Sequence, residues 1–585
     1  MKSGYGSIGA VGETVDLLPR DDESTDVVRR ETASLIPSRP SWKVGMVVTT
    51  FLALVVWSST LPKNTTTARE NDDIPLLGKS RSSHHHKHHY KKHFLLKEKY
   101  DEKELFFDDQ YLDHIGQDTE HHTSKLQTYS QRYYKKSKYW KGPGHPILMI
   151  LGGEDSLDLP MLYPYVNKGI AKEFHAFVVS PEHRFYGKSQ PIIDPTDDEL
   201  VKYLTPDQAL ADAINLLQML REELGCSNDP TSKKYCPVIT FGGSYPGFLS
   251  TMMRFRFPDY VDIAYASSAP LELYSQLVDA NAYYDKVTEV ADKASSGCSS
   301  AVHSTLVAVR DEILANYTSV VEAAGAVGFC EKHFPKYMKD IPEFISETIT
   351  YLVPAIFADF NMAYYPPGPT TALARACSVF QQSDKTPMER MSNFFDLRGE
   401  VEYGLDHKPK CFDLSLELPS GPNARIRGAD NSGTGGGFTG EIWEFQCCKD
   451  LIIRAGYSEE SMFLSRPFNY TWHTEHCHER FPSVPVEPYR MVNQWGFNDL
   501  SQTTNILFAN GLNDGWSTSS ILATDNPNLA VLNFPNGAHH SELGSVYPRE
   551  DDTDDIVAGH AKAIVILGQW LNEIKSQQVA DESRR

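Results

Sequence analysis

Ser244 stands at a turn that could expose a reactive hydroxyl. Residues 238–241 before it are β-branched and aromatic, as in a buried parallel strand, and residues 248–257 have the pattern of a helix. Two glycines directly before the serine let the chain turn sharply, so its Oγ would lie at the helix N-terminus, where backbone N–H groups stabilise an oxyanion. This arrangement predicts a nucleophile elbow, although Pro246 replaces the usual glycine two residues after the serine. The alternative is an ordinary glycine-rich turn.

Two further strand-like runs are each followed by a residue that could assist this serine. Residues 505–511 lead to Asp514, and residues 529–534 lead to His539 and His540. A serine hydroxyl needs an imidazole to take its proton, and the imidazole needs a carboxylate to hold its tautomer. The order Ser, Asp, His along the chain is that of an α/β-hydrolase. Spacing alone does not choose between the two histidines.

A fourth strand-like run ends in two glycines. Residues 147–151 are followed by Gly152, Gly153 and Glu154. In an α/β-hydrolase, a backbone N–H of this loop and the N–H of the residue after the nucleophile, here Tyr245, form the oxyanion hole. A plain Gly-Gly turn is the alternative.

Composition sets the class of protein. The chain has 585 residues, with Lys+Arg 56, Asp+Glu 77 and a formal net charge of −21. With 41% hydrophobic residues it can build a large core, and a mean hydropathy of −0.40 excludes a polytopic membrane protein. The excess of acids argues against nucleic-acid binding, which depends on phosphate neutralisation. The length fits two to four domains, or one large α/β domain with an insertion.

One segment, residues 44–61, could cross a membrane. It begins at Val44, ends at Leu61, carries no formal charge, and approaches the roughly 20 residues that a crossing takes. More basic residues precede it than follow it closely, which favours a cytosolic N-terminus and a lumenal body. We therefore expect a type II signal anchor. The alternative is a late signal peptide, cleaved to give a secreted protein.

Signals on both sides of this segment point to the endosomal, lysosomal or vacuolar system. Residues 13–18 and 31–36 each place an acid before a Leu-Leu or Leu-Ile pair and resemble dileucine signals read by sorting adaptors. Glycosylation sequons begin at Asn64, Asn316 and Asn469, all on the predicted lumenal side.

The remaining features concern metals and cysteines. A His-rich run at residues 84–93 could bind metal but lacks the fixed spacing of a structural metal site, so we expect a solvated stalk and no metal or cofactor, with metal binding as the alternative. Cys226 and Cys236 bracket a short polar loop and could pair in an oxidising compartment. The chain has nine cysteines, so at least one lacks an intramolecular partner.

Short stretches along the chain resemble the prolyl carboxypeptidase (lysosomal Pro-X carboxypeptidase) family of serine peptidases. That family also holds dipeptidyl-peptidase II and thymus-specific serine protease. The resemblance extends from about Phe107 to about Trp570. It is carried by residues 110–114, 131–134, 151–154, 182–189, 204–212 and 266–270.

The resemblance implies a role for each candidate residue. Ser244 would be the nucleophile, Asp514 the orienting acid and His539 the base, in an α/β-hydrolase fold with a largely helical domain inserted between nucleophile and acid. The implied disulfides are Cys298–Cys377, Cys330–Cys411 and Cys448–Cys477, which would leave Cys447 spare. The expected division is a tail (1–43), an anchor (44–61), a stalk (62–104), the hydrolase domain (105–280 and 486–575), the insertion (281–485) and a disordered end (576–585).

The family's members cleave peptides next to proline, from one terminus. A proline ring needs an apolar, aromatic pocket, for which we expect Trp516, Phe248 and Glu154, although Trp516 and Phe248 could equally be core residues. Gly544 stands where the family often has an arginine after its paired histidines. The function implied is a serine exopeptidase acting on peptides, with an esterase or lipase, or a silent binding protein of the same fold, as alternatives. The oligomeric state is open, with a homodimer as one option.

Overall fold

The structure, a computed structural model, describes residues 104–116, 127–157, 163–331, 338–405, 408, 410–413, 438–544 and 547–584. The expected cytosolic tail, the anchor segment 44–61 and the sequon at Asn64 lie outside these residues. Across the described ranges, no helix has both the length and the apolar character that crossing a bilayer requires.

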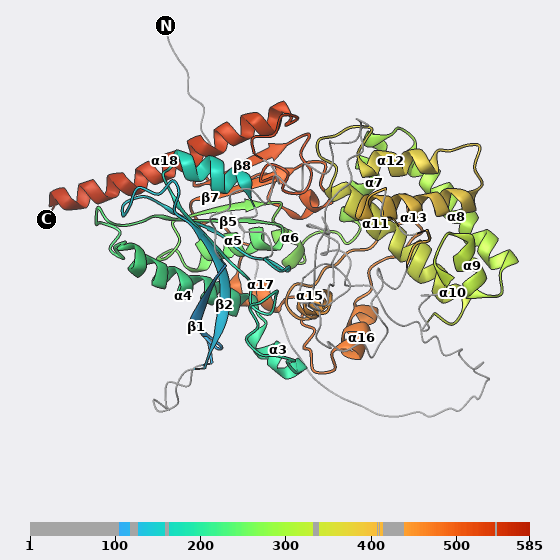
Figure 1. The fold of residues 1–585 in the computed structure, drawn as a ribbon, viewed down its shortest axis with the longest axis horizontal. Helices are drawn as coiled ribbons and strands as arrows, with labels where there is room; N and C mark the ends of the chain where they lie inside the picture. The colour runs from blue at the N-terminus through green and yellow to red at the C-terminus, as the bar shows by residue number, and fades with distance from the viewer. Residues whose placement is uncertain are drawn as a thin grey trace, which may run out of the picture. The chain divides into compact units, whose positions relative to one another are not determined.

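One mixed eight-stranded sheet forms the centre of the fold (Figure 1). The strand order is β1-β2-β4-β3-β5-β6-β7-β8, in which β2 runs antiparallel to both neighbours and all other pairs are parallel. The strands are β1 (Leu105–Tyr111), β2 (Thr128–Lys136), β3 (Ile147–Ile150), β4 (Phe177–Pro181), β5 (Val238–Gly243), β6 (Ile263–Ser267), β7 (Ile506–Gly511) and β8 (Leu529–Phe534). This mixed sheet with its helices agrees with the α/β-hydrolase-like fold expected from the sequence.

Both faces of the central strands are buried. Ile147 and Met149 of β3 pack into one hydrophobic cluster, whereas Leu148 and Ile150 pack into a second cluster. Alternate residues of a strand point to opposite faces, so these two clusters are the two sides of the sheet. Burial on both sides explains why the parallel strands read as continuous apolar runs in the sequence.

Helices from distant parts of the chain cover the two faces. On the side of Ile147 lie α4 (Pro206–Leu224) and α5 (Tyr245–Arg256). The opposite side is covered by the π-helix η1 (Tyr165–Ile170), α2 (Ala171–Glu173) and α18 (Asp554–Arg584). Figure 1 shows α4 and α18 on opposite sides of the strands.

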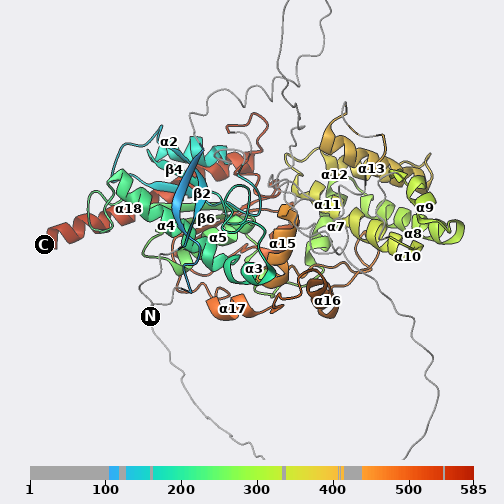
Figure 2. The same ribbon diagram turned by 60° about the horizontal axis from the view of Figure 1, so that its bottom comes forward.

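Between β6 and β7, the described residues form helices and add no strand to the sheet. The helices are α6 (Leu271–Tyr274), α7 (Ala282–Ala294), α8 (Cys298–Asn316), α9 (Val320–Ala326), α10 (Ile341–Phe344), the π-helix η3 (Ile345–Leu352), α11 (Val353–Met362), α12 (Ala372–Phe380), α13 (Pro387–Tyr403), α15 (Phe438–Lys449), α16 (Tyr470–Arg480) and α17 (Arg490–Trp495). Helices α7, α8, α12 and α13 pack against one another (Figures 1 and 2). Elsewhere lie α3 (Asp197–Tyr203) and the 3-10 helix η4 (Gly515–Ser519).

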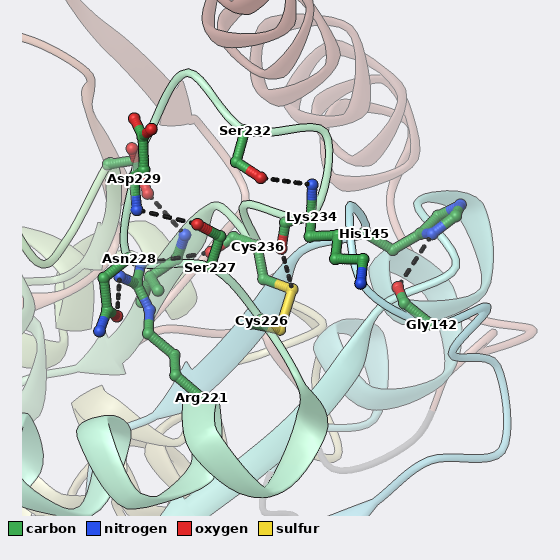
Figure 3. The surroundings of a disulfide bond; sticks show 12 residues. Gly142, His145, Arg221, Cys226, Ser227, Asn228, Asp229, Ser232, Lys234 and Cys236 are labelled. Atoms are coloured by element: carbon green, nitrogen blue, oxygen red, sulfur yellow. Dashed lines mark hydrogen bonds between the residues drawn. A yellow bond between two sulfur atoms is a disulfide. The ribbon is translucent and has the colours of Figure 1, made fainter.

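A disulfide closes the loop that leads into β5, the strand before Ser244 (Figure 3). Helix α4 is capped by Gly225, whose φ of 69° is left-handed and suits glycine, and Cys226 follows directly. Cys226 is bonded to Cys236, and within the loop the N–H of Ser227 donates to the carbonyl of Lys234 at 2.9 Å. The other disulfides join Cys298 to Cys377, Cys330 to Cys411 and Cys448 to Cys477, and Cys447 is buried as a free thiol.

The expected disorder at residues 576–585 is wrong for most of that segment, because α18 continues to Arg584. The segment contains no glycine or proline, and its Gln, Ala, Glu and Arg residues have good helix propensity. Nothing in the local sequence therefore ends the helix that begins at Asp554.

Two buried carboxyl groups in the helical region have oxygens without a hydrogen-bond partner among the described residues. Glu347 lies in η3 with its Oε2 unpaired, and both carboxyl oxygens of Asp359 in α11 are unpaired, with the Arg398 guanidinium 3.2 Å away as an ion-pair partner. Burial raises the pKa of Glu347 to about 8, and burial, partly offset by Arg398, raises the pKa of Asp359 to about 7. Both groups are therefore neutral in the folded protein under acidic conditions.

We expect the protein to be less stable at pH 8 than at pH 5. The unfolded chain ionises Glu347 above its ordinary pKa of 4.5, whereas the folded chain keeps Glu347 protonated up to about pH 8, so stability falls across this range. Replacing Glu347→Gln should raise Tm at pH 8 by about 2–6 °C and change it little at pH 5. Differential scanning fluorimetry measures both, with the exposed Glu322→Gln in α9 as the control. Equal Tm values for wild type at the two pH values would contradict the prediction.

Candidate active site

Ser244 lies at a sharp turn between β5 and α5. Its φ of 62° and ψ of −130° are a strained conformation for a residue with a side chain. A Cβ on Gly242 would come within 2.0 Å of the Pro246 carbonyl oxygen, and one on Gly243 within 2.8 Å of the His540 ring. The turn thus closes only with glycines at both positions, and it presents the half-buried serine at the start of a helix.

Pro246 does not disturb this turn. It lies in the first turn of α5, where a backbone N–H has no carbonyl partner within the helix, so the missing donor costs no hydrogen bond. Proline's fixed φ also suits a helix start.

Asp514 and His539 are brought together by the loops after β7 and β8. Their hydrogen bond is short, with His539 Nδ1 2.6 Å from Asp514 Oδ2. The other carboxylate oxygen accepts the Trp516 N–H at 3.0 Å, so the acid caps η4 and is held in one orientation. Because Nδ1 carries the proton in a bond to a carboxylate, Nε2 of the imidazole is the free, basic nitrogen.

The free nitrogen of His539 is buried and has no hydrogen-bond partner among the described residues. No hydrogen bond between it and Ser244 Oγ is present there. The loop that carries His539 does approach the serine turn, since the His539 ring lies 4.5 Å from the His540 ring, which in turn packs on Gly243. Nucleophile–base bonds are often long in the absence of substrate, so this geometry is compatible with a triad.

His540 has a different environment from His539. Its backbone N–H donates to Ser268 Oγ at 3.0 Å, and its side-chain Nε2 is buried without a partner. Burial, together with the neighbouring His539, holds the pKa of His540 well below the usual value of 6.5. The geometry pairs the acid with the first histidine, a choice that spacing alone left open.

The loop after β3 approaches the same turn. A Cβ on Gly152 would lie 2.6 Å from the Pro181 carbonyl oxygen, and one on Gly153 would lie 2.5 Å from Pro246 Cγ. Both glycines are therefore required by close packing, and Gly153 directly contacts the helix that follows Ser244. This contact brings the Gly152-Gly153 loop next to the first turn of α5.

A buried network behind Tyr245 was not predicted from the sequence. The His183 Nδ1–H donates to a backbone carbonyl at 2.8 Å, so its Nε2 accepts the Tyr245 hydroxyl at 3.0 Å. The Gln446 amide donates to the same hydroxyl at 3.3 Å and accepts from Tyr186. Burial lowers the pKa of His183 to about 4, so this network contains no charge under mildly acidic conditions.

Asn361 of α11 was also missed, and it braces the acid. Its amide nitrogen donates to the Asn513 carbonyl at 2.8 Å, and its amide oxygen accepts the Gly515 N–H at 2.8 Å. The next residue, Met362, accepts the His539 N–H at its carbonyl. Asn361 lies far from Asp514 in the sequence and within a helical pattern, so no local signal could have identified it.

The two aromatic pocket candidates are both largely buried. Phe248 is fully buried and packs against Tyr274, Trp495 and Phe497, which is a core position. Trp516 is 4% exposed and packs on Tyr283.

A cavity of about 500 Å³ lies elsewhere, on the surface. It is lined by Leu271, Phe497 and Asp525 among others, and it includes none of the three candidate catalytic residues.

Two carboxyl groups near the site have raised pKa values and are neutral under acidic conditions. Burial raises the pKa of Glu154, after the Gly-Gly pair, to about 7, and it raises the pKa of Glu542, two residues after His540, to about 7.

Among the described residues, no cluster of His, Cys, Asp or Glu has the arrangement of a metal site. The two described sequon asparagines, Asn316 and Asn469, are exposed.

Replacing Asn361→Leu should lower kcat by about 10- to 100-fold, because the buried Gly515 N–H and Asn513 carbonyl lose their partners and the acid shifts. Steady-state kinetics on any hydrolysed substrate measure this, with Asn393→Leu, a half-buried asparagine of α13, as the matched control. If Asn361→Leu lowers stability but keeps the wild-type kcat, Asn361 has no role in positioning the acid.

Comparison with known proteins places the chain in a family. Lysosomal Pro-X carboxypeptidase from Homo sapiens is 28% identical over 445 residues, which cover 74% of this chain and 82% of that protein. Thymus-specific serine protease from Mus musculus is 27% identical over 472 residues, covering 78% of this chain and 86% of that protein.

Among solved structures, proline iminopeptidase from Mycobacterium smegmatis aligns with 76% of this chain and 96% of its own, at 12% identity and a TM-score of 0.29, which is too low to bear on the fold. The family described as Serine carboxypeptidase S28 matches residues 112–563. This match spans most of the chain, and the chain therefore belongs to the serine carboxypeptidase S28 family and is a serine-type peptidase.

Proposed function

We propose that this protein is an exopeptidase that cleaves peptides near one end, next to proline, with Ser244 as nucleophile, His539 as base and Asp514 as orienting acid. The observation that carries the proposal is the 2.6 Å bond from His539 to Asp514, which leaves Nε2 of the same ring unpaired near a strained serine turn. An imidazole held in this tautomer is what a serine hydroxyl needs to lose its proton.

The reaction follows from this arrangement. The Ser244 oxygen adds to the carbonyl carbon of the scissile bond as its proton passes to Nε2 of His539. The oxyanion that forms accepts hydrogen bonds from the N–H groups of Tyr245 and of the Gly152-Gly153 loop. Collapse breaks the C–N bond, and His539 gives its proton to the leaving amine. Water then attacks the acyl-serine by the same route and restores the free enzyme.

Proline selectivity rests on the relatives and on one candidate pocket residue. The human relative is named a Pro-X carboxypeptidase, and that name describes the relative's own substrate. In this chain, the Trp516 indole lies two residues after Asp514, packs on Tyr283, and donates its Nε1–H to Met362 Sδ at 3.2 Å. A small movement of the Trp516 and Tyr283 rings would expose the apolar surface that a proline ring needs. Phe248 is not part of the proposed pocket, because it is fully buried.

We also propose that the catalytic part lies in the lumen of an endosomal, lysosomal or vacuolar compartment, anchored through residues 44–61. Four disulfides and two exposed sequon asparagines, Asn316 and Asn469, are compatible with an oxidising, glycosylating route. The human relative is named as lysosomal. Loss of mass on endoglycosidase treatment and resistance to added protease in sealed vesicles would support this topology.

Peptide hydrolysis should depend on Ser244 and on His539 but much less on His540. Ser244→Ala and His539→Gln should each lower kcat by about 10⁴-fold or more, while His540→Gln, which changes a ring that has no bond to the acid, should have a far smaller effect. The assay is mass spectrometry of a mixed peptide library at pH 4–7, with short acyl esters and a fluorophosphonate label alongside.

Each other outcome of this assay would identify a different function. Turnover of esters without peptides would indicate an esterase or lipase. Absence of both turnover and labelling would indicate a binding protein. Full activity of His539→Gln with loss in His540→Gln would exchange the roles of the two histidines.

A further inference from the structure

Tyr245 directly follows the candidate nucleophile, and its buried side chain is hydrogen-bonded at its far end. The hydroxyl donates to His183 Nε2 at 3.0 Å and accepts from the Gln446 amide at 3.3 Å. The Trp443 ring packs beside the Tyr245 ring, with the ring centroids 5.2 Å apart. The proposed reaction uses only the backbone N–H of Tyr245, so it assigns no role to these side-chain contacts.

The donors and acceptors of this network have one consistent order. Burial lowers the pKa of His183 to about 4, so above that pH the ring is neutral and carries one N–H. The Arg184 carbonyl can only accept, so this proton lies on Nδ1, and Nε2 accepts from Tyr245. The one hydroxyl proton of Tyr245 is then used, so the Gln446 nitrogen is the donor to the Tyr245 oxygen. The Gln446 oxygen accepts the Tyr186 hydroxyl at 2.5 Å, so Gln446 joins the two tyrosines.

The two sides of the network belong to different parts of the fold. His183 and Tyr186 lie in the loop after β4, whereas Trp443 and Gln446 lie in α15 of the helical insertion. This loop and α15 also pack together in one hydrophobic cluster. The insertion therefore reaches the residue next to Ser244 through buried contacts.

Helix α15 is itself held on both sides of Gln446. Two residues before it, the Glu444 carboxylate pairs with the Arg480 guanidinium at 2.9 Å. Two residues after it, Cys448 forms a disulfide with Cys477. Both partners lie in α16, so the two helices are joined by an ion pair and by a covalent bond. Gln446 thus has little freedom to move away from Tyr245.

The turn that carries Tyr245 needs support of this kind. Ser244 has a φ of 62°, and a strained conformation persists only where its surroundings hold it. In the proposed reaction, the Tyr245 N–H acts only if it lies about 2.7–3.1 Å from the position that the oxyanion takes. Holding the far end of the side chain restricts rotation of the whole residue, and it therefore restricts the direction of the N–H.

We propose that Gln446 is a positioning residue for the oxyanion donor: it holds the Tyr245 side chain against His183 and so directs the Tyr245 N–H at the oxyanion. This inference rests on the proposed function and gives the helical insertion a part in the chemical step. The N–H contacts the oxyanion only in the tetrahedral state. Loss of the anchor should therefore lower kcat without raising KM.

The test uses Gln446→Met in the full chain, which keeps the length of the side chain and removes both of its hydrogen bonds. We expect kcat to fall about 10-fold, with KM nearly unchanged, for the peptide that wild type cleaves fastest. Phenylboronic acid forms a tetrahedral adduct with an active serine, so its affinity should fall by a similar factor.

Gln276→Met is the matched control. Gln276 is also a buried glutamine, but its amide bonds to the Ile452 carbonyl and to the Tyr470 hydroxyl. This variant should lose stability to a similar extent and keep the wild-type kcat. An equal loss of kcat in both variants would show a general effect of destabilisation and would overturn the inference.

A double-mutant cycle shows whether Gln446 acts through the Tyr245 hydroxyl. Tyr245→Phe removes this hydroxyl and keeps the backbone N–H, so Gln446→Met should lower kcat much less in that background than in wild type. Fully additive losses would overturn the inference, as would a rise in KM at constant kcat.

Hydrogen exchange separates this inference from the proposed function. Peptic fragments that cover the β5–α5 turn should exchange faster in Gln446→Met than in wild type or in Gln276→Met, whether or not the protein cleaves a peptide. A wild type without turnover and without boronate binding would overturn the proposed function. Unchanged exchange at the turn in Gln446→Met would overturn the anchoring role of Gln446.

Discussion

The close packing around the β5–α5 turn is the constraint on which the rest of the site depends. Gly242 touches the backbone of the helix that follows it, Gly243 touches a histidine ring, and Gly153 touches Pro246. Three segments from distant parts of the sequence meet here at distances that leave no room for a Cβ. This packing holds Ser244 at the end of β5, and it limits where the Gly152-Gly153 loop and the loop of His539 and His540 can lie. The strain at Ser244 is held in place by the buried strands on both sides.

Several carboxyl groups of this protein are buried, and their hydrogen bonding differs from one to another. Glu154, Glu347, Asp359 and Glu542 are all buried, and burial raises the pKa of each. In Asp514, both oxygens are hydrogen-bonded. The protein thus places several incompletely paired carboxyl groups where an acidic solution keeps them neutral, whereas the carboxylate that pairs with His539 has a partner on each oxygen. Such a design suits an acidic compartment better than a neutral one.

Local patterns were sufficient to predict the elements that carry the chemistry. The strand runs before Ser244, Gly152 and Asp514 are short and apolar, they end in glycine or in polar loops, and each is a strand in the sheet. The carboxyl ends of parallel strands meet at one edge, so the loops after them were expected to converge. The family resemblance supplied what these patterns could not, including the helical insertion and the disulfide partners.

What the sequence could not predict are contacts made across hundreds of residues. Asn361 reads as an ordinary helix residue, and Gln446 follows a segment with no strong pattern, yet both reach the site. Phe248 had the spacing of a pocket residue, but the sequence does not say which side of α5 faces the core. The length of α18 was underestimated because a polar terminal segment resembles a disordered one unless its propensity is weighed.

Helix α11 belongs to the helical insertion, but it supports loops that follow strands of the sheet. Asn361 and Met362 belong to the helical insertion, yet they hold backbone groups on both sides of Asp514 and at His539. The helical insertion thus supports the loops that form the candidate active site. Deleting the insertion to obtain a smaller hydrolase would therefore also remove the residues that hold the Asp514 and His539 loops in place.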